Sequence, residues 1–238
     1  MYRRIAFAVL AVTVVLAGWW AFSLARLPDR TIGLFTSLPI LWNEADDLKG
    51  MVDAPAGRHW ALAVLERRGK VLPLDTLLDL SRVDELVVAQ PRPLVPEENV
   101  ALDAWVRKGG HVLMFADPML TQESAFALGD RRRPQDVALV SPILARWGLE
   151  LQFDESQPGG GRESAGERLP INLAGAFRTI PGGHDANCAI ENSGLIARCE
   201  VGKGRAVLVA DAALLEPEDD GNTRAERFGG LLQEAMGQ

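Results

Sequence analysis

The chain has 238 residues, of which 47% are hydrophobic and 24% charged, and its formal net charge is −7. This length allows one well-filled core and is near the upper end for a single domain. The acidic balance makes the chain a poor candidate for binding nucleic acid, because phosphate backbones attract concentrated Lys and Arg.

The N-terminal residues are predicted to form a membrane anchor. The segment Ile5–Leu24 is 20 residues long and carries no charge, and a helix needs about 20 residues to cross a hydrocarbon core. Trp19 and Trp20 lie near its far end, where aromatic rings favour the headgroup layer. The alternative is a cleaved signal peptide, whose apolar region is usually shorter. The chain is therefore divided into an anchor with its flank, residues 1–30, and an exported α/β domain, residues 31–238.

The charges around this segment predict its orientation. Arg3 and Arg4 precede it, which favours a cytoplasmic N-terminus with the bulk of the chain outside, although Arg26 and Arg30 at the other end weaken that asymmetry. The expected location is the bacterial inner membrane, with a single span and a periplasmic domain. After residue 30 the chain holds 21 basic and 31 acidic residues, a net charge of −10, which does not suit a flat position on anionic lipid.

Beyond residue 30, apolar strand patterns alternate with amphipathic helix patterns. Helices are predicted where apolar residues recur at spacings of three and four, with Pro near the start and Gly after the end. In chain order the predicted elements are strand Thr31–Thr36, helix His59–Arg68, strand Val71–Leu74, strand Leu86–Ala89, helix Pro96–Lys108, strand His111–Ala116, helix Pro142–Trp147, strand Leu149–Phe153, strand Arg205–Ala210 and helix Thr223–Met236.

This order of elements predicts the fold class. The strand at 86–89, the helix at 96–108 and the strand at 111–116 form a βαβ unit, which implies parallel pairing with a right-handed crossover. Strands that alternate with helices indicate a doubly wound α/β sandwich with a mainly parallel sheet. Loops near 119–136 and 155–169 are predicted to be mobile, and the second is polar and rich in glycine.

Cys188 and Cys199 flank a predicted hairpin that adds an antiparallel edge to the sheet. If Asn192–Leu195 form a four-residue loop, the two cysteines lie opposite each other, at a separation that a disulfide tolerates. An oxidising compartment, as expected for an exported domain, would preserve the bond. The alternative is a pair of reduced thiols that pack as small apolar side chains.

Ligands of open α/β sheets bind outside the carboxyl ends of the strands. Asp117 and Asp211 would approach each other there only if their strands are neighbours, and could then share a proton or hold a cation. The favoured alternative is that each caps the following turn through backbone N–H groups. Trp42 could stack on a ligand or pack in the interior. The candidate ligand-binding residues at this edge are Thr36, Ser37, Trp42, Gln90, Arg92, Asp117 and Asp211.

Motifs for metal, nucleotide and nucleophilic chemistry are missing from the sequence. The three His residues have no metal-ligand spacing, no Gly-x-Ser-x-Gly elbow is present, and the segments Gly159-Gly160-Gly161 and Gly202-Lys203-Gly204 lack the P-loop spacing. We therefore expect no metal, no cofactor and no catalytic residue. The basic run Arg131–Arg133 could bind phosphate or an acidic partner, or pair with the excess acid of the domain itself.

Four segments, in this order and spacing, resemble a known family. They are TSLPILW at 36–42, PLVPEENVALDAWVRKGGHVLMFADP at 93–118, SPILARWGLEL at 141–151 and GKGRAVLVADAALL at 202–215. The pattern resembles the auxiliary membrane proteins of ABC-type transport linked to gliding motility, and related bacterial proteins with a domain like the class I glutamine amidotransferases. The resemblance implies a flavodoxin-like sandwich with a binding or assembly role. It does not imply amidotransferase activity, because the strand at 111–116 ends in Asp117-Pro118 where such enzymes place a nucleophilic Cys.

The favoured function is a non-catalytic, membrane-anchored α/β domain that serves a membrane complex, with ABC-type transport as the expected system. Its expected partners are integral membrane proteins such as a permease with its ATPase, and no nucleic acid. One alternative is an exported module that binds a small molecule or a glycan at the strand ends. The other is a hydrolase that uses Asp117 or Asp211.

Overall fold

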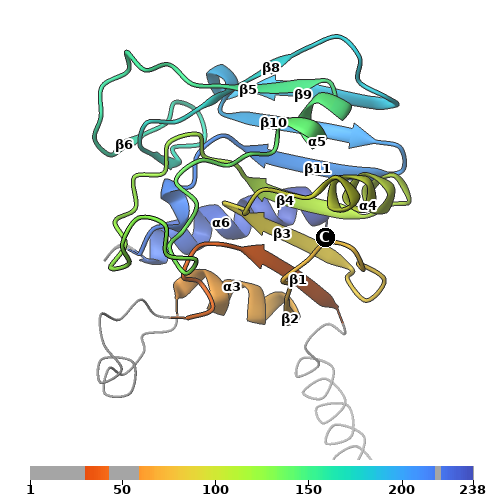
Figure 1. Ribbon diagram of the computed structural model, residues 1–238, viewed down its shortest axis with the longest axis horizontal. Coiled ribbons are helices and arrows are strands. Elements are labelled where there is room, and N and C mark those ends of the chain that lie inside the picture. The colour runs from red at the N-terminus through yellow and green to blue at the C-terminus, as the bar shows by residue number, and fades with distance from the viewer. Residues whose placement is uncertain (1–29, 43–58, 218–220, 238) are drawn as a thin grey trace, which may run out of the picture.

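The structure is a computed structural model that describes residues 30–42, 59–217 and 221–237. Its centre is a seven-stranded sheet with the strand order β2-β1-β3-β4-β11-β10-β9, which runs from bottom to top in Figure 1. Two small sheets, β5-β8 and β6-β7, lie toward the β9 end of this sheet. The described chain is therefore one large sheet with a smaller β-rich excursion at one side.

The elements have the following bounds. The central strands are β1 (Thr31–Thr36), β2 (Lys70–Pro73), β3 (Glu85–Ala89), β4 (His111–Phe115), β9 (Ala186–Glu191), β10 (Ile196–Val201) and β11 (Gly204–Val209). The small sheets contain β5 (Leu149–Gln152), β6 (Arg162–Glu163), β7 (Pro170–Ile171) and β8 (Ala176–Thr179). The helices are α3 (Trp60–Arg68), α4 (Pro96–Arg107), α5 (Ser141–Arg146) and α6 (Gly221–Met236), with short 3₁₀ turns η1 (Asn192–Gly194) and η2 (Ala213–Leu215).

Five neighbouring strands, from β2 to β11, are parallel, and β10 and β9 continue the sheet in antiparallel fashion. The parallel part has the order second-first-third-fourth-fifth along the chain, which is the flavodoxin-like order. The predicted α/β fold with a mainly parallel sheet and an antiparallel edge is confirmed. Its topological switch point lies between β1 and β3, where the chain reverses the direction in which it adds strands.

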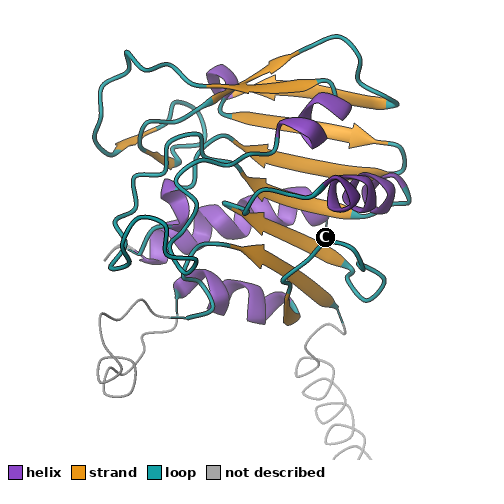
Figure 2. Ribbon diagram, viewed as in Figure 1, coloured by secondary structure: helices purple, strands orange, loops and turns teal. Residues whose placement is uncertain are grey.

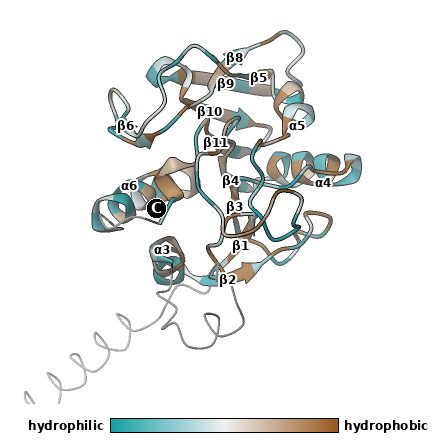
Figure 3. Cartoon of the chain, turned by 60° about the vertical axis from the view of Figure 1, so that its left-hand side comes forward, coloured by the Kyte–Doolittle hydropathy of each residue, from teal (hydrophilic) through white to brown (hydrophobic). Residues whose placement is uncertain are grey.

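Helices cover both faces of the sheet. Figure 3 shows α3 and α6 on one side of the strands and α4 and α5 on the other. The central strands are therefore buried on both faces, as the fully buried residues of β3 show. Runs such as LVV in β3 and VLMF in β4 are the continuous apolar pattern that this position requires.

Local chemistry explains where α4 begins. Pro96 occupies the first turn, where its missing N–H is not needed. The Glu98 side chain accepts a hydrogen bond from the backbone N–H of Val95, the residue before the helix, at 3.1 Å. This bond satisfies a backbone N–H that would otherwise have no partner at the start of the helix. The predicted helix at 96–108 therefore matches α4 to within one residue.

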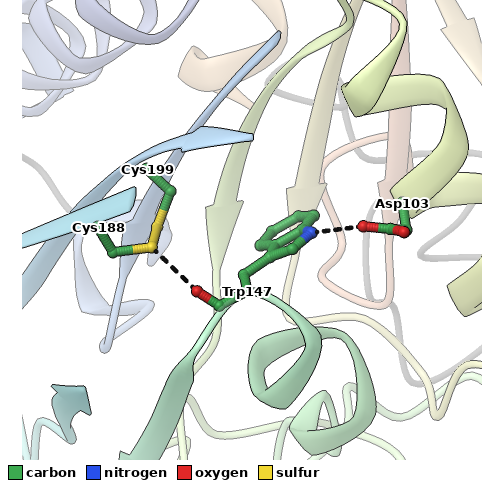
Figure 4. The surroundings of a disulfide bond; sticks show 4 residues. All are labelled: Asp103, Trp147, Cys188 and Cys199. Atoms are coloured by element: carbon green, nitrogen blue, oxygen red, sulfur yellow. Dashed lines mark hydrogen bonds between the residues drawn. A yellow bond between two sulfur atoms is a disulfide. The ribbon is translucent and has the colours of Figure 1, made fainter. Parts of the chain in front are cut away.

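The hairpin of β9 and β10 places Cys188 directly opposite Cys199, and the structure joins them in a disulfide with a Cα–Cα distance of 4.0 Å. Residues 192–195 form the connection, with the Leu195 N–H donating to the Asn192 carbonyl. Figure 4 shows the bond beside Trp147. The Cys188 sulfur lies 3.4 Å from the Trp147 carbonyl oxygen; we treat this as a packing contact, because a disulfide sulfur carries no proton.

Within the described ranges, no helix combines the length and the apolar character that crossing a bilayer requires. The predicted anchor Ile5–Leu24 lies outside the described residues.

Candidate functional site

The carboxyl ends of the parallel strands meet at one edge of the sheet, the left-hand side of Figure 1. Figure 2 shows that long loops gather at this edge. The strand order places Thr36 and Ser37 after β1, Gln90 after β3, Asp117 after β4 and Asp211 after β11. Most of the predicted site residues therefore do lie at a common edge.

The crevice at the switch point is filled by the protein itself. The Gln90 side chain is fully buried and donates to the carbonyl oxygens of Asp117 and Gln135 at 3.1 and 2.8 Å. It accepts from the Asp117 backbone N–H at 2.9 Å. The Ser37 hydroxyl donates to the Gln90 carbonyl at 2.5 Å and accepts from the Gln135 N–H at 3.0 Å. The loop after β4 thus occupies the place where a ligand was expected, and sequence reasoning missed Gln135.

Arg92 is also engaged internally. Its guanidinium forms two hydrogen bonds to the Glu98 carboxylate, at 2.7 and 2.8 Å, and lies over the Phe35 ring at 5.0 Å. The hydrogen bonds from Arg92 lower the pKa of Glu98 to about 2. The hydroxyl of Thr36, another predicted site residue, accepts a hydrogen bond from the Leu38 backbone N–H. The Trp42 side chain is 39% exposed, and Trp42 is the last described residue before 43–58.

Asp117 and Asp211 end the neighbouring strands β4 and β11 and are both buried. Asp117 accepts from the Met119 N–H at 2.8 Å, which caps the turn after β4. Its second oxygen accepts from the Ala212 N–H at 3.1 Å, which joins this turn to the end of β11.

Asp211 makes the same pair of contacts on its own side. One oxygen accepts from the Ala213 N–H at 2.6 Å, within its own turn. The other accepts from the Asn172 N–H at 2.9 Å, in the segment between β7 and β8. The turn-capping interpretation therefore describes both residues, and each also holds a second segment in place.

Burial raises the pKa values of both carboxyl groups. Desolvation raises the pKa of Asp117 to about 6. Desolvation, and then the negative charge of Asp117, raise the pKa of Asp211 well above its usual value. Glu216 adds a smaller unfavourable charge to both. Two carboxyl groups in such surroundings retain a proton more readily than two separate ones.

A cavity of about 380 Å³ opens at the same edge of the sheet, next to the segment that Asp211 holds. Its walls come from the excursion at 150–195, which contributes the end of β5, the β6-β7 hairpin, the start of β8 and the turn η1. We call it the edge pocket. It is lined by Gln152, Phe153, Asp154, Gln157, Arg162, Ser164, Ala165, Ile171, Ala174, Gly175, Ala176, Arg178, Asn192, Ser193 and Leu195.

The backbone around the edge pocket is unusual. Leu173, Asn192 and Ser193 have φ values of 56°, 52° and 56°, in the left-handed region that non-glycine residues seldom adopt. Conformations of this kind concentrate at binding and catalytic sites, where surrounding contacts hold them. Here the Asn192 amide donates to the Ser164 hydroxyl at 3.2 Å. The sequence predicted a loop at Asn192–Leu195, but not its left-handed backbone or its place in a pocket wall.

The charged side chains of the edge pocket differ in whether they have hydrogen-bond partners within the described chain. Arg162 donates to the Gln157 side chain at 2.9 Å and to the Pro158 carbonyl at 3.1 Å. Asp154 accepts from the Ser156 N–H and hydroxyl, and the hydroxyl bond is the main cause that lowers its pKa. The Arg178 guanidinium, in contrast, makes no hydrogen bond or ion pair with any described residue.

Among the residues in the described ranges, no group of three or more His, Cys, Asp or Glu side chains could hold a metal ion. Two of the His side chains have structural partners. His59 accepts from the Ala61 N–H at the start of α3, and His111 Nδ1 lies 3.0 Å from the Met236 carbonyl.

No protein-family model and no curated protein sequence matches the chain. Similar solved structures include the exo-β-1,4-mannosidase Op5Man5 from Opitutaceae bacterium strain TAV5, at 15% identity and a TM-score of 0.49, covering 87% of this chain and 36% of that one. A ThuA-like protein from Parabacteroides merdae is 12% identical with a TM-score of 0.42, covering 88% and 90%. The protein STM3548 from Salmonella typhimurium is 13% identical with a TM-score of 0.44, covering 74% and 85%.

The other similar structures include β-galactosidases at 12–15% identity. This chain spans about a third of the length of these glycosidases. The strand order of the central sheet by itself agrees with the predicted flavodoxin-like fold.

Two predictions are corrected by these findings. The predicted function as a non-catalytic auxiliary component of a transport complex is corrected, because the similar structures named here are glycosidases, ThuA-like proteins and STM3548, and none of these is described as a transport component. These likenesses bear on the fold alone. The physical cause is that a helix ending in Lys-Gly-Gly before an apolar strand is an αβ junction common to many parallel sheets.

The predicted location, a single span in the bacterial inner membrane with a periplasmic domain, is corrected as well. STM3548 is described as a cytoplasmic protein, and the described residues contain no helix that could cross a membrane. The location was inferred from length and hydropathy of a segment that the structure does not describe.

Proposed function

We propose that this chain recognises a small polar molecule with an anionic group, such as a phosphate or a carboxylate, in the edge pocket. The observation that carries the proposal is the Arg178 guanidinium, which faces the pocket without a partner among the described residues. A planar guanidinium binds carboxylate and phosphate through two parallel hydrogen bonds.

The setting of Arg178 explains why it stays available. It lies opposite Glu150 in the register of β8 with β5, yet these two side chains form no ion pair. Instead, Glu150 accepts from the Gln152 amide at 2.8 Å. No ion pair across the two strands therefore holds the Arg178 guanidinium.

The other polar groups of the pocket suit a ligand that also carries hydroxyl or amine groups. The lowered pKa of Asp154 keeps its carboxylate ionised at neutral pH, so that it can accept hydrogen bonds from a ligand. The Ser193 hydroxyl and the Gln152 amide also line the pocket. A cavity of about 380 Å³ is in the range that small-molecule sites occupy.

The experiment compares thermal unfolding of the full chain in inorganic phosphate and in chloride at matched ionic strength. A ligand that binds only the folded state raises the midpoint temperature. We expect phosphate to raise it for the native chain and for Arg82→Ala, an exposed arginine outside the pocket. We expect the increase to be lost in Arg178→Ala.

Two results would contradict the proposal. One is the absence of any phosphate-dependent increase in the native chain. The other is an equal increase in Arg178→Ala and Arg82→Ala, which would place the anion outside the edge pocket.

A further inference from the structure

One surface of α4 carries an ordered set of side chains. Glu97, Val100, Ala104 and Lys108 follow one another at spacings of three, four and four residues, which places them along one stripe of the helix and its C-cap. Glu97 and Lys108 are exposed, and Val100 is 68% exposed although it is apolar. We call this set the α4 stripe.

Beside the α4 stripe, α4 and α5 enclose a groove of about 640 Å³. Leu94, Val100 and Ala104 line it from the α4 side, and Pro142 and Ile143 from the α5 side. It is the apolar surface of a helix pair with no further element of the described chain packed over it, as the outer position of α4 in Figure 3 illustrates.

The groove has a rigid base. Asp103 accepts from Arg107 at 2.9 Å, from Arg146 at 2.6 Å and from the Trp147 indole at 2.9 Å. These bonds fix α4 to α5, and the last of them is visible in Figure 4. A surface held in this way is prepared for docking without rearrangement.

The charges of the α4 stripe are arranged in a self-complementary order. The acid, Glu97, is at the start of the helix and the base, Lys108, at its end, with Val100 and Ala104 between them. Eleven residues of helix separate Glu97 from Lys108, about 16 Å, so the two cannot pair within one chain. Neither makes an ion pair with another described residue.

We propose that the α4 stripe is a docking surface for a second copy of this chain. The two α4 helices lie antiparallel about a two-fold axis, so that Glu97 of each copy faces Lys108 of the other. Val100 of one copy packs on Ala104 of the other, at the border of the groove. A two-fold axis uses the same patch on both copies, and therefore needs a patch that is complementary to itself. A stripe with acid at one end, base at the other and apolar residues between them meets that condition.

The test measures the mass of the full chain by sedimentation over a range of concentrations, in a nonionic detergent that prevents association through the apolar segment 5–24. We expect a dimer that dissociates on dilution and is weakened by salt, because its ion pairs lie at the rim. Lys108→Glu, which places like charges together twice in each dimer, should weaken dimerisation about tenfold or more. Val100→Asp should do the same.

The deciding variant is the double exchange Glu97→Lys with Lys108→Glu, which reverses both charges and restores their complementarity. It should dimerise as strongly as the native chain, whereas each single exchange should dimerise more weakly. Lys70→Glu, an exposed lysine on the edge strand β2, changes the net charge equally and should leave the dimer intact. A native chain that stays monomeric, or a double exchange as defective as the singles, would overturn the proposal.

Discussion

At the scale of single residues, the most informative group is the buried pair Asp117 and Asp211. Each carboxyl group accepts two backbone N–H bonds, which favour the ionised form, while burial opposes it more strongly. One hydrogen bond of Asp211 reaches Asn172, next to Ile171 in the wall of the edge pocket. The protonation state of this pair therefore affects the strength of a hydrogen bond that holds the pocket wall.

The raised pKa values predict how stability depends on pH. A folded-state pKa above the unfolded value means that the folded chain binds protons more tightly, so the free energy of unfolding falls as pH rises between the two values. For Asp117 this window runs from the ordinary aspartate pKa of 3.8 to a pKa of about 6, and the free energy of unfolding falls by about 3 kcal/mol across it. Because the pKa of Asp211 is also raised, the fall in the free energy of unfolding continues to higher pH.

Urea unfolding at pH 5 and pH 7 measures this slope. Asp211→Asn removes one of the two charges and should flatten the profile relative to the native chain, although it loses one of the two N–H bonds at every pH, because an amide NH2 cannot accept. Identical pH profiles for the native chain and Asp211→Asn would show that the pair does not titrate as described.

Some of the residue roles could be predicted from the sequence and others could not. That an Asp after a strand caps its own turn follows from local chemistry, as at Asp117 and Met119. The bonds from Asp117 to Ala212 and from Asp211 to Asn172 join residues 95 and 39 positions apart. They depend on which strands are neighbours, and no local pattern encodes that. Arg178 was missed because an exposed arginine in a short strand has no distinguishing sequence signal.

At the scale of elements, the close approach of β11 to the end of α4 is the tightest constraint. A Cβ atom on Gly204, the first residue of β11, would overlap the backbone carbonyl oxygens of Val106 and Gly110. Backbone atoms cannot move aside as a flexible side chain can, so this position requires glycine for reasons of space alone.

Gly204→Ala should therefore lower the free energy of unfolding by about 1–3 kcal/mol, the usual cost of an added methyl group in a filled space. The matched control is Gly161→Ala, where a Cβ atom would meet nothing within 4 Å. Chemical denaturation of both variants makes the comparison. Equal stabilities would mean that β11 and α4 are less closely packed than the structure has them.

The elements differ in how well their sequence predicts them. The helix α4 was predicted to within one residue because Pro96, Glu98 and the double glycine after it are local signals. The strands β6 and β7 have two residues each, and β8 pairs with β5 across more than twenty intervening residues. Such short strands form because of their partners and carry no periodic pattern of their own.

At the scale of the whole molecule, the disulfide joins the two outermost antiparallel strands. Cys199 is buried and Cys188 is half-buried, so the bond lies partly within reach of solvent. A bond that closes a loop of 11 residues restricts the unfolded chain and typically stabilises the folded state by about 2–4 kcal/mol.

Reduction should accordingly lower the midpoint of urea unfolding. The double variant Cys188→Ala, Cys199→Ala should match the reduced native chain and should not respond to the reductant. A native chain equally stable with and without the reductant, despite complete reduction confirmed by thiol counting, would contradict this role.

The same covalent link bears on how the sheet opens. Strand β9 has a hydrogen-bonded neighbour on one side only and would by itself fray first, as terminal strands do. Because the disulfide joins facing residues of β9 and β10, β9 can separate from the sheet only if β10 also opens. We therefore expect slow amide proton exchange in β9 as well as in β10. Cutting the sulfur–sulfur bond should release that protection from β9 first and leave the parallel strands unaffected.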